Sequence, residues 1–261
     1  MKVTWLGHST VLVEVAGLRL VADPLLRARI GPLRRAVPLP PATSRLRHGV
    51  DAVLLSHLHR DHCDLPSLRL LRAPVVLAPP GAGAWLSGEG LAGVSELAPY
   101  EVVALSEEVT VTAVPAHHHH RREPLGPSAR PVGHVVEGPD GAAWLAGDTG
   151  LFPEMVQVQA ATRRGVDLAV IPIWGWGPRL GPGHLDPRAA AQATLLAGAR
   201  RALPVHWGTL YPVGLRPAMG GRLRNPGREF AHHLAAEASR ADVDVQAHVI
   251  KVGGSVDLTG A

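Results

Sequence analysis

The chain has 261 residues, of which 46% are hydrophobic and 18% are charged, so it can bury a sizeable core. The sequence has no run of 18 apolar residues, so we expect no membrane segment. Residues 2–7 have the pattern of a strand rather than of a signal peptide, and the one cysteine, Cys63, excludes an internal disulfide. We therefore expect a cytoplasmic protein. The formal net charge of +4 comes from scattered arginines, which argues against nucleic acid as a partner.

The first half of the chain alternates short apolar segments with turns. The Ala16-Gly17 turn joins two of these segments as a hairpin, so the chain opens as a meander of strands. The stretch 31–42 is rich in glycine and proline and is predicted to be a loop. Strands are predicted over residues 2–6, 10–15, 18–22, 51–55, 74–77, 109–114, 132–137, 142–146 and 168–173.

Helices are predicted over residues 65–71, 188–202 and 228–241. The last two follow Asp186-Pro187 and Asn225-Pro226, in each case an N-cap residue before a proline at the first helical position. Strands and helices are mixed throughout, and no linker separates the chain into halves. We therefore expect an α+β protein with one domain over residues 1–261.

The densest motif of the sequence directly follows the strand predicted at 51–55. His57, His59, Asp61 and His62 lie within six consecutive positions. His57 and His59 are two residues apart and point the same way from an extended segment, so they can bind one ion, whereas Asp61 and His62 can face a second ion. Imidazole and carboxylate ligands suit zinc, manganese or iron, and the absence of thiolate ligands argues for a catalytic rather than a structural site.

Three further candidates stand where predicted strands end. They are the histidine run 117–120, of which we expect one member to be a ligand, Asp148 in a glycine-flanked turn, and His206. The glycine before Asp148 lets its carboxylate approach an ion closely, and one of its oxygens can bridge two ions.

Together these segments resemble the metallo-β-lactamase superfamily. The resemblance is closest to the branch that includes N-acyl-phosphatidylethanolamine phospholipase D and the ascorbate-6-phosphate lactonases. The segments that carry it span nearly the whole chain in the expected order; they are residues 4–14, 23–24, 56–64, 114–118, 147–149, 184–187 and 206–209.

The resemblance implies a four-layer αββα sandwich of two pseudo-symmetric halves. It selects His118 from its run, because the family's ligand histidine follows Pro-Ala by one intervening residue, and it leaves the roles of His117, His119 and His120 open. It also implies a homo-oligomer. Carried over residue by residue, it implies that one metal ion is held by His57, His59 and His118, the other by Asp61, His62 and His206, and that Asp148 bridges them.

The implied cofactors are two divalent metal ions, zinc first, with manganese or iron as alternatives. Such a pair would activate a bridging hydroxide as nucleophile, with Asp61 relaying its proton. His8 and Asp23 are expected to orient ligands through hydrogen bonds. His184 is the leading site residue that is not a ligand, so the predicted catalytic residues are Asp61, Asp148 and His184.

Specificity is expected from the glycine-rich and proline-rich segment 173–184, whose two tryptophans suit a substrate wall. A phosphate could be held by arginines near the site; the candidates are Arg121, Arg122, Arg130, Arg222 and Arg224.

The predicted function is a dinuclear metal-dependent hydrolase that cleaves a phosphodiester or a lactone or ester bond of a small-molecule substrate. Two alternatives stay open at this point. One is an RNA-processing nuclease of the same superfamily, which the basic charge favours, and the other is a metal-binding homologue without catalytic activity.

Overall fold

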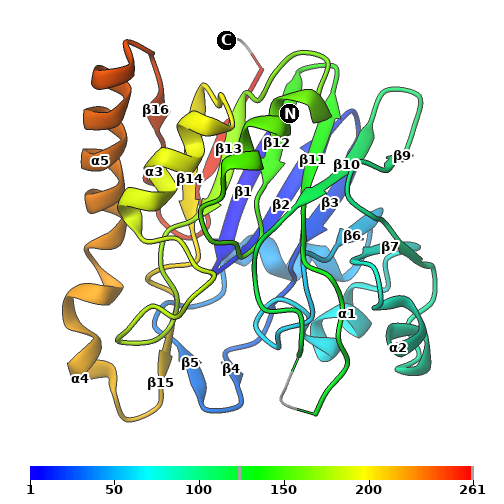
Figure 1. Ribbon diagram of the computed structural model, residues 1–261. Helices are drawn as coiled ribbons and strands as arrows, with labels where there is room; N and C mark the ends of the chain where they lie inside the picture. Colours follow the sequence, from blue (N-terminus) through cyan, green and yellow to red (C-terminus); the bar gives the residue numbers. More distant parts are fainter. Residues whose placement is uncertain (123–124, 260–261) are drawn as a thin grey trace.

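The computed structural model describes residues 1–122 and 125–259, and Figure 1 shows two β-sheets packed face to face with helices outside them. The first sheet has the strand order β17-β1-β2-β3-β6-β7-β8. β1, β2 and β3 form an antiparallel meander, whereas β6, β7 and β8 continue the sheet in parallel. The strands are β1 (Lys2–Gly7), β2 (Thr10–Val15), β3 (Leu18–Ala22), β6 (Ala52–Leu54), β7 (Val75–Ala78), β8 (Val94–Glu96) and β17 (Ser255–Asp257).

The second sheet repeats this plan with the order β16-β14-β13-β12-β11-β10-β9. β10, β11 and β12 are an antiparallel meander, and β13, β14 and β16 continue it in parallel. The two halves therefore have matching topologies. The strands are β9 (Val102–Ala104), β10 (Thr110–Pro115), β11 (Val132–Gly138), β12 (Gly141–Leu145), β13 (Leu168–Pro172), β14 (Arg201–Val205) and β16 (Gln246–Ala247).

Alternation of side chains along the strands creates the layers. In β2, Val11 and Val13 point into the core between the sheets, whereas Leu12 points to the outer side. The helices α1 (Leu65–Leu71) and α2 (Gly83–Gly88) cover that outer side, and α3 (Pro187–Leu196) and α5 (Pro226–Ala241) cover the outer side of the second sheet. The expected four-layer αββα sandwich is confirmed.

A third, three-stranded sheet lies below the sandwich in Figure 1. It consists of β4 (Arg29–Ile30), β5 (Leu33–Arg35) and β15 (Leu210–Pro212), with β5 in the middle. The remaining elements are short: the 3-10 helices at Pro41–Arg47, Pro153–Ala161 and Gly220–Leu223, and α4 (Arg216–Met219). No helix among the described residues is long and apolar enough to cross a membrane.

The sequence prediction was wrong in three places. The helix expected over 188–202 ends at Leu196, because Gly198 has a φ of +61° and the chain turns there into β14. Asn225 precedes α5, but its backbone is helical and its side chain makes no capping hydrogen bond. The loop expected over 31–42 contains β5 and the start of a 3-10 helix.

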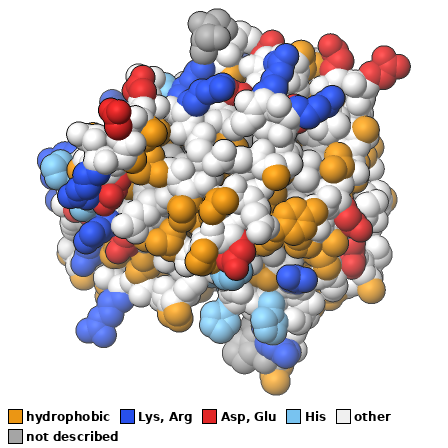
Figure 2. All heavy atoms as spheres, turned by 45° about the horizontal axis from the view of Figure 1, so that its top comes forward, with side chains coloured by type: hydrophobic (Ala, Val, Ile, Leu, Met, Phe, Trp, Pro, Cys, Tyr) orange, Lys and Arg blue, Asp and Glu red, His pale blue; other side chains and the backbone are white. Residues whose placement is uncertain are grey.

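Basic side chains do not form one tract on the face shown in Figure 2, where blue and red groups are interspersed. This agrees with the scatter of arginines along the sequence.

Candidate metal centre

The predicted ligands converge at one edge of the sandwich, where strands of both sheets end. The segment that starts at Ser56 follows β6, His118 follows β10, Asp148 follows β12, and His206 directly follows β14. The carboxyl ends of parallel strands form such a crevice in many sheet proteins.

His57, His59 and His118, called here the first triad, face one another. Nε2 of His57 and Nε2 of His118 each lie 3.0 Å from Nδ1 of His59. The structure thus brings together the three residues expected to hold one ion, and it selects the same member of the histidine run as the family resemblance.

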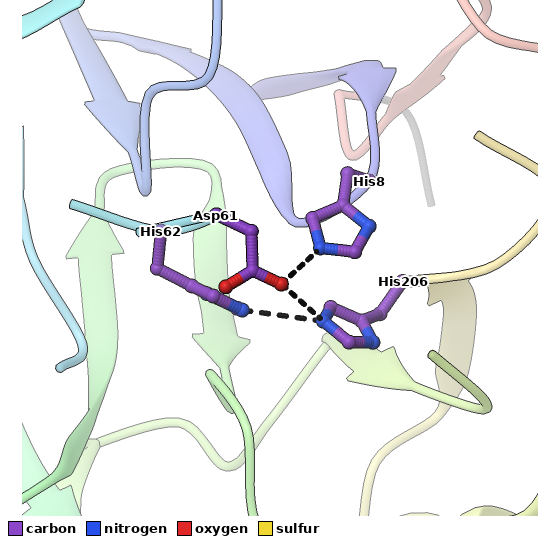
Figure 3. Close-up of side chains that lie close together, drawn as sticks. All are labelled: His8, Asp61, His62 and His206. Carbon is purple, nitrogen blue, oxygen red and sulfur yellow. Dashed lines mark hydrogen bonds and ion pairs between the residues drawn. The ribbon is translucent and has the colours of Figure 1, made fainter. Parts of the chain in front are cut away.

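Asp61, His62 and His206, called here the second triad, meet beside His8 (Figure 3). Nε2 of His62 and Nε2 of His206 are 3.2 Å apart, and Oδ2 of Asp61 lies 3.9 Å from the latter. His8 Nε2 lies 3.0 Å from the same Asp61 oxygen, so His8 orients this carboxylate as expected.

Asp148 lies between the triads and is almost fully buried. Its Oδ2 is 3.2 Å from His206 Nε2 and 3.3 Å from His62 Nε2 in the second triad, and 3.9 Å from His118 Nε2 in the first. Its Oδ1 is buried without a hydrogen-bond partner. Gly147 permits this approach, since a Cβ at this residue would lie 2.5 Å from the Cβ of Ser56.

The outer nitrogen of each ring is held by an acceptor. His59 Nε2 donates to the carbonyl oxygen of Arg121 (3.1 Å), His118 Nδ1 to that of Gly183 (2.7 Å), and His206 Nδ1 to that of Trp174 (2.9 Å). Such bonds fix the tautomer, and they leave the inner nitrogens as acceptors that point into the site.

Asp23 connects the two triads from behind. Its Oδ2 accepts a hydrogen bond from His62 Nδ1 at 2.8 Å and one from the Ser56 hydroxyl at 2.6 Å. The same hydroxyl oxygen lies 2.9 Å from His57 Nδ1, from which it can accept. One buried carboxylate therefore supports one histidine of each triad, the role predicted for Asp23.

The pKa values of the site histidines show where the protein favours positive charge. Burial lowers the pKa of His57 well below its usual value and that of His118 to about 4, so both rings are neutral. Burial also opposes charge on His62, but Asp148 and Asp23 outweigh it and raise its pKa well above the usual value. The site therefore stabilises positive charge between its carboxylates.

These observations fit divalent metal ions. In the first triad the neutral rings carry their protons on the outer nitrogens. The inner nitrogens, 3.0 Å apart, therefore have no proton to share and direct their lone pairs at one another. A cation between them would stabilise this arrangement. The orphaned Asp148 Oδ1 is a further available ligand atom. Burial raises the pKa of the Cys63 thiol to about 12, and none of the clusters of potential ligands among the described residues contains Cys63.

Three residues of the site have strained backbones. His8, Asp23 and His206 have φ values of +54°, +42° and +63°, in the left-handed region that side chains other than glycine and asparagine seldom occupy. Hydrogen bonds compensate this conformation: the His206 amide donates to the His8 carbonyl oxygen at 3.0 Å, and the His8 amide donates to the Thr209 hydroxyl at 2.8 Å.

His184 reaches the centre from the loop before α3. Its Nε2 lies 3.5 Å from Asp148 Oδ2, and its side chain is 24% exposed. Burial lowers its pKa, but the hydrogen bond and the charge of Asp148 raise it more, so the net shift is upward. His184 and Trp176 line a pocket of about 360 Å³ that opens onto the centre, whereas Trp174, the other tryptophan of the segment 173–184, is buried and is not part of this lining.

The other members of the histidine run point elsewhere. The His117 ring stacks on Phe152 with 3.9 Å between centroids, and His120 Nδ1 lies 2.7 Å from the Ser128 hydroxyl. His119 lines a second groove with them, and His118 of the first triad borders the same groove.

Two of the arginines predicted to hold a phosphate make other contacts. Arg122 donates to the Cys63 carbonyl oxygen at 2.9 Å and also to that of Leu58, but it lines the pocket beside the centre as well, so its predicted role stays a prediction. The Arg222 guanidinium lies 4.6 Å from the centroid of the Trp174 ring. Arg121, Arg130 and Arg224 are exposed, and Arg224 directly follows the Gly220–Leu223 helix, so their predicted role stays a prediction.

Sequence reasoning missed the carbonyl acceptors and the role of Ser56. The carbonyls leave no trace in residue type, because every residue has one. The position of Ser56 directly before the first histidine was the available signal.

Comparison with known protein families gives one match over most of the chain. Residues 19–207 match the family model described as the beta-lactamase superfamily domain.

Curated relatives cover a similar span. An uncharacterized protein of Mycobacterium tuberculosis is 33% identical over 273 residues, which cover 100% of this chain and 69% of that protein. A metal-dependent hydrolase of Pyrobaculum neutrophilum is 30% identical, covering 99% of this chain and 100% of its own. The N-acyl-phosphatidylethanolamine-hydrolyzing phospholipase D 1 of Caenorhabditis elegans is 31% identical over 81% of this chain and 64% of its own.

Solved structures share the fold at lower identity. Igni18, a metallo hydrolase of the archaeon Ignicoccus hospitalis, superposes with a TM-score of 0.73 at 21% identity, covering 98% of this chain and 97% of its own. An isothiocyanate hydrolase from Delia radicum gut bacteria gives a TM-score of 0.72 at 16% identity, covering 98% and 99%.

Proposed function

The chain belongs to the metallo-β-lactamase superfamily and is a metal-dependent hydrolase, and from this premise we propose that it uses two divalent metal ions to cleave a phosphodiester or a lactone or ester bond. Zinc is the proposed metal, with manganese or iron as alternatives, because imidazole and carboxylate ligands suit all three.

The observation that carries the proposal is the position of Asp148 Oδ2. This single oxygen faces histidine nitrogens of both triads at 3.2 to 3.9 Å, so one carboxylate is shared between two binding positions. Two ions a few ångströms apart require such a shared ligand, whereas one ion does not.

The first triad would hold one ion and the second triad the other, with Asp148 common to both. When bound, such a pair supplies Lewis acidity to the scissile group and lowers the pKa of water toward neutrality. Proton transfer and the positioning of the substrate depend on side chains of the protein.

His184 and Asp61 are the residues proposed to handle protons. Both line the pocket above the centre, so both are accessible to a substrate. The His184 ring is held through Nδ1 by the Gly181 carbonyl oxygen at 3.2 Å, which leaves its Nε2 beside Asp148 to meet the leaving group. The nearby histidines keep the pKa of Asp61 well below its usual range despite its burial, so Asp61 is ionised, and its proposed part in proton relay rests on its position in the pocket.

The phosphodiester alternative draws support from the relatives that are named for hydrolysing N-acyl-phosphatidylethanolamine, itself a phosphodiester. The ester or lactone alternative requires the same side chains, since both reactions add water across a polarised oxygen-containing group.

The test is metal content by mass spectrometry on protein purified without chelator, together with hydrolysis of bis-p-nitrophenyl phosphate and of p-nitrophenyl acetate in zinc and in manganese. We expect two equivalents of metal and turnover of one substrate class. Asp148→Ala should lower the metal content below one equivalent and reduce turnover by about a thousandfold or more, because both binding positions lose a ligand.

Asp244→Ala, at an exposed carboxylate, is the matched control and should change neither quantity. Binding of less than one equivalent by the reconstituted wild-type protein would contradict the assignment of the ligands. Two equivalents without turnover of either substrate would contradict the choice of bonds.

A further inference from the structure

The pocket above the metal centre is lined by two kinds of side chain. The polar and charged ones are His59, Arg60, Asp61, Arg122, Asp148 and His184. The apolar ones are Ile30, Pro32 and Leu33 from the β4–β5 hairpin together with Trp176 from the segment 173–184. A bound molecule would therefore meet both polar side chains and hydrocarbon within one pocket.

The apolar surface of the β4–β5 hairpin is preformed, because packing and hydrogen bonds hold the hairpin in place. Ile30 and Leu33 pack with Leu25 and Leu210 in a small hydrophobic cluster of their own, separate from the three large cores. β5 pairs with β15, and the Val213 amide donates to the Pro32 carbonyl oxygen at 2.8 Å. The apolar surface is thus present before any ligand arrives.

The same hairpin is attached to the metal centre. β15 begins four residues after His206, and the Ala36 amide donates to the Thr209 carbonyl oxygen at 2.7 Å. The Thr209 hydroxyl in turn accepts from the amide of His8. The distance between the apolar surface and the ligands is therefore fixed by a few residues of continuous chain.

Trp176, from the segment 173–184, is the fourth apolar residue of the lining. It is 40% exposed, although a tryptophan is large and apolar and is normally mostly covered. An apolar molecule bound in this pocket would pack against the exposed ring of Trp176.

We propose that the pocket selects substrates in which one apolar group, a hydrocarbon chain or a ring, is attached next to the scissile polar group. This inference rests on the proposed function for the position of the scissile group. The volume of about 360 Å³ is near the lower end of small-molecule pockets, which suits one chain or ring.

The first test is binding and needs no turnover. Methyl-, butyl- and hexylphosphonate are titrated into the zinc-loaded protein by calorimetry. The affinity should rise by about three- to fourfold for each added methylene group, the value expected for burial of hydrocarbon. Equal affinities along the series would overturn the inference.

The second test locates the apolar contact. In Trp176→Ala the gain per methylene should fall to about half or less of the wild-type gain, while methylphosphonate still binds, since its phosphonate contacts are unchanged. Tyr100→Ala is the matched control, because Tyr100 is another exposed aromatic residue but does not line the pocket. An unchanged gain in Trp176→Ala would show that the apolar groups bind elsewhere.

The third test separates this inference from the proposed function. Methyl, butyl and hexyl p-nitrophenyl phosphate are compared as substrates, and kcat/KM should rise in the same proportion as the affinities. Hydrolysis that does not depend on chain length would sink the inference alone. Phosphonate affinities that rise with chain length, without hydrolysis of any phosphate or carboxylate ester, would sink the proposed function alone.

Discussion

The floor of the site and its wall are built in different ways. The floor consists of the two triads and Asp148, and its histidine rings are fixed by hydrogen bonds from their outer nitrogens. The wall consists of the β4–β5 hairpin and Trp176, and apolar packing holds the hairpin in place. Hydrogen bonds demand particular residues at particular positions, whereas apolar packing tolerates exchange among side chains of similar size. Chemistry and selectivity should therefore be separable by mutation.

His184 offers the strongest test of this division, because it belongs to the segment 173–184 that carries Trp176 of the wall, while its ring lies beside Asp148 of the floor. In His184→Gln we expect kcat to fall by about 100-fold, since glutamine cannot transfer a proton, while two equivalents of metal remain bound. Kinetics and metal analysis on the same sample measure both. His232→Gln, at a histidine on α5, is the control. Loss of one metal equivalent would instead make His184 a ligand and part of the floor.

Asp23 tests whether the floor acts as one unit. In Asp23→Asn the affinity for both ions should fall by about 10- to 100-fold, because the amide supports His62 and, through Ser56, His57 less well than a carboxylate. Competition with a chromophoric chelator measures the two affinities. Asp51→Asn, which alters a carboxylate bound to the Arg19 amide, should leave them unchanged. Weakening of one ion only would show that the triads are supported independently.

Arg35 tests the attachment of the wall and should have the smallest effect. It is buried, burial lowers its pKa to about 10, and its guanidinium donates to the carbonyl oxygens of Leu6 (2.8 Å) and Leu25 (3.3 Å). In Arg35→Met these carbonyls lose their donor, so the free energy of unfolding should fall by about 1–3 kcal/mol. KM for the hexyl substrate should rise a few-fold at unchanged metal content.

Thermal unfolding and steady-state kinetics measure these two changes. Arg34→Met, at the exposed neighbour in β5, is the control. A fall in metal content of Arg35→Met would show that the wall and the floor are not separable at this residue.

Much of the floor could be predicted from the sequence, because its ligands are rare residue types at strand ends. The spacing of His57 and His59 and the glycine before Asp148 both express geometric needs of an ion site, and the structure brings these residues together. His118 could be distinguished from its neighbours only by family resemblance, since four consecutive histidines look alike to any argument from spacing. That these residues bind metal stays a prediction, as do the cytoplasmic location and the homo-oligomer.

Trp176 lies in the segment 173–184 that the sequence indicated as a substrate wall, but the hairpin part of the wall could not be predicted, for physical reasons. β4 and β5 have only two and three residues, too few for a hydrophobic period to appear, and they depend on pairing with a strand about 180 residues later in the chain. The error over residues 188–202 has a related cause. Alanine and arginine favour helices, but β14 is placed by its pairing with β13 and β16, which overrides local propensity.

The left-handed backbones of His8, Asp23 and His206 have a consequence for protein engineering. Each such conformation costs on the order of 1 kcal/mol or more, and glycine would relieve that cost at all three positions. A selection for thermal stability alone would therefore drift toward substitutions at the site itself and discard its function. Libraries built to make this protein more robust should hold these three positions constant and seek their gains elsewhere in the chain.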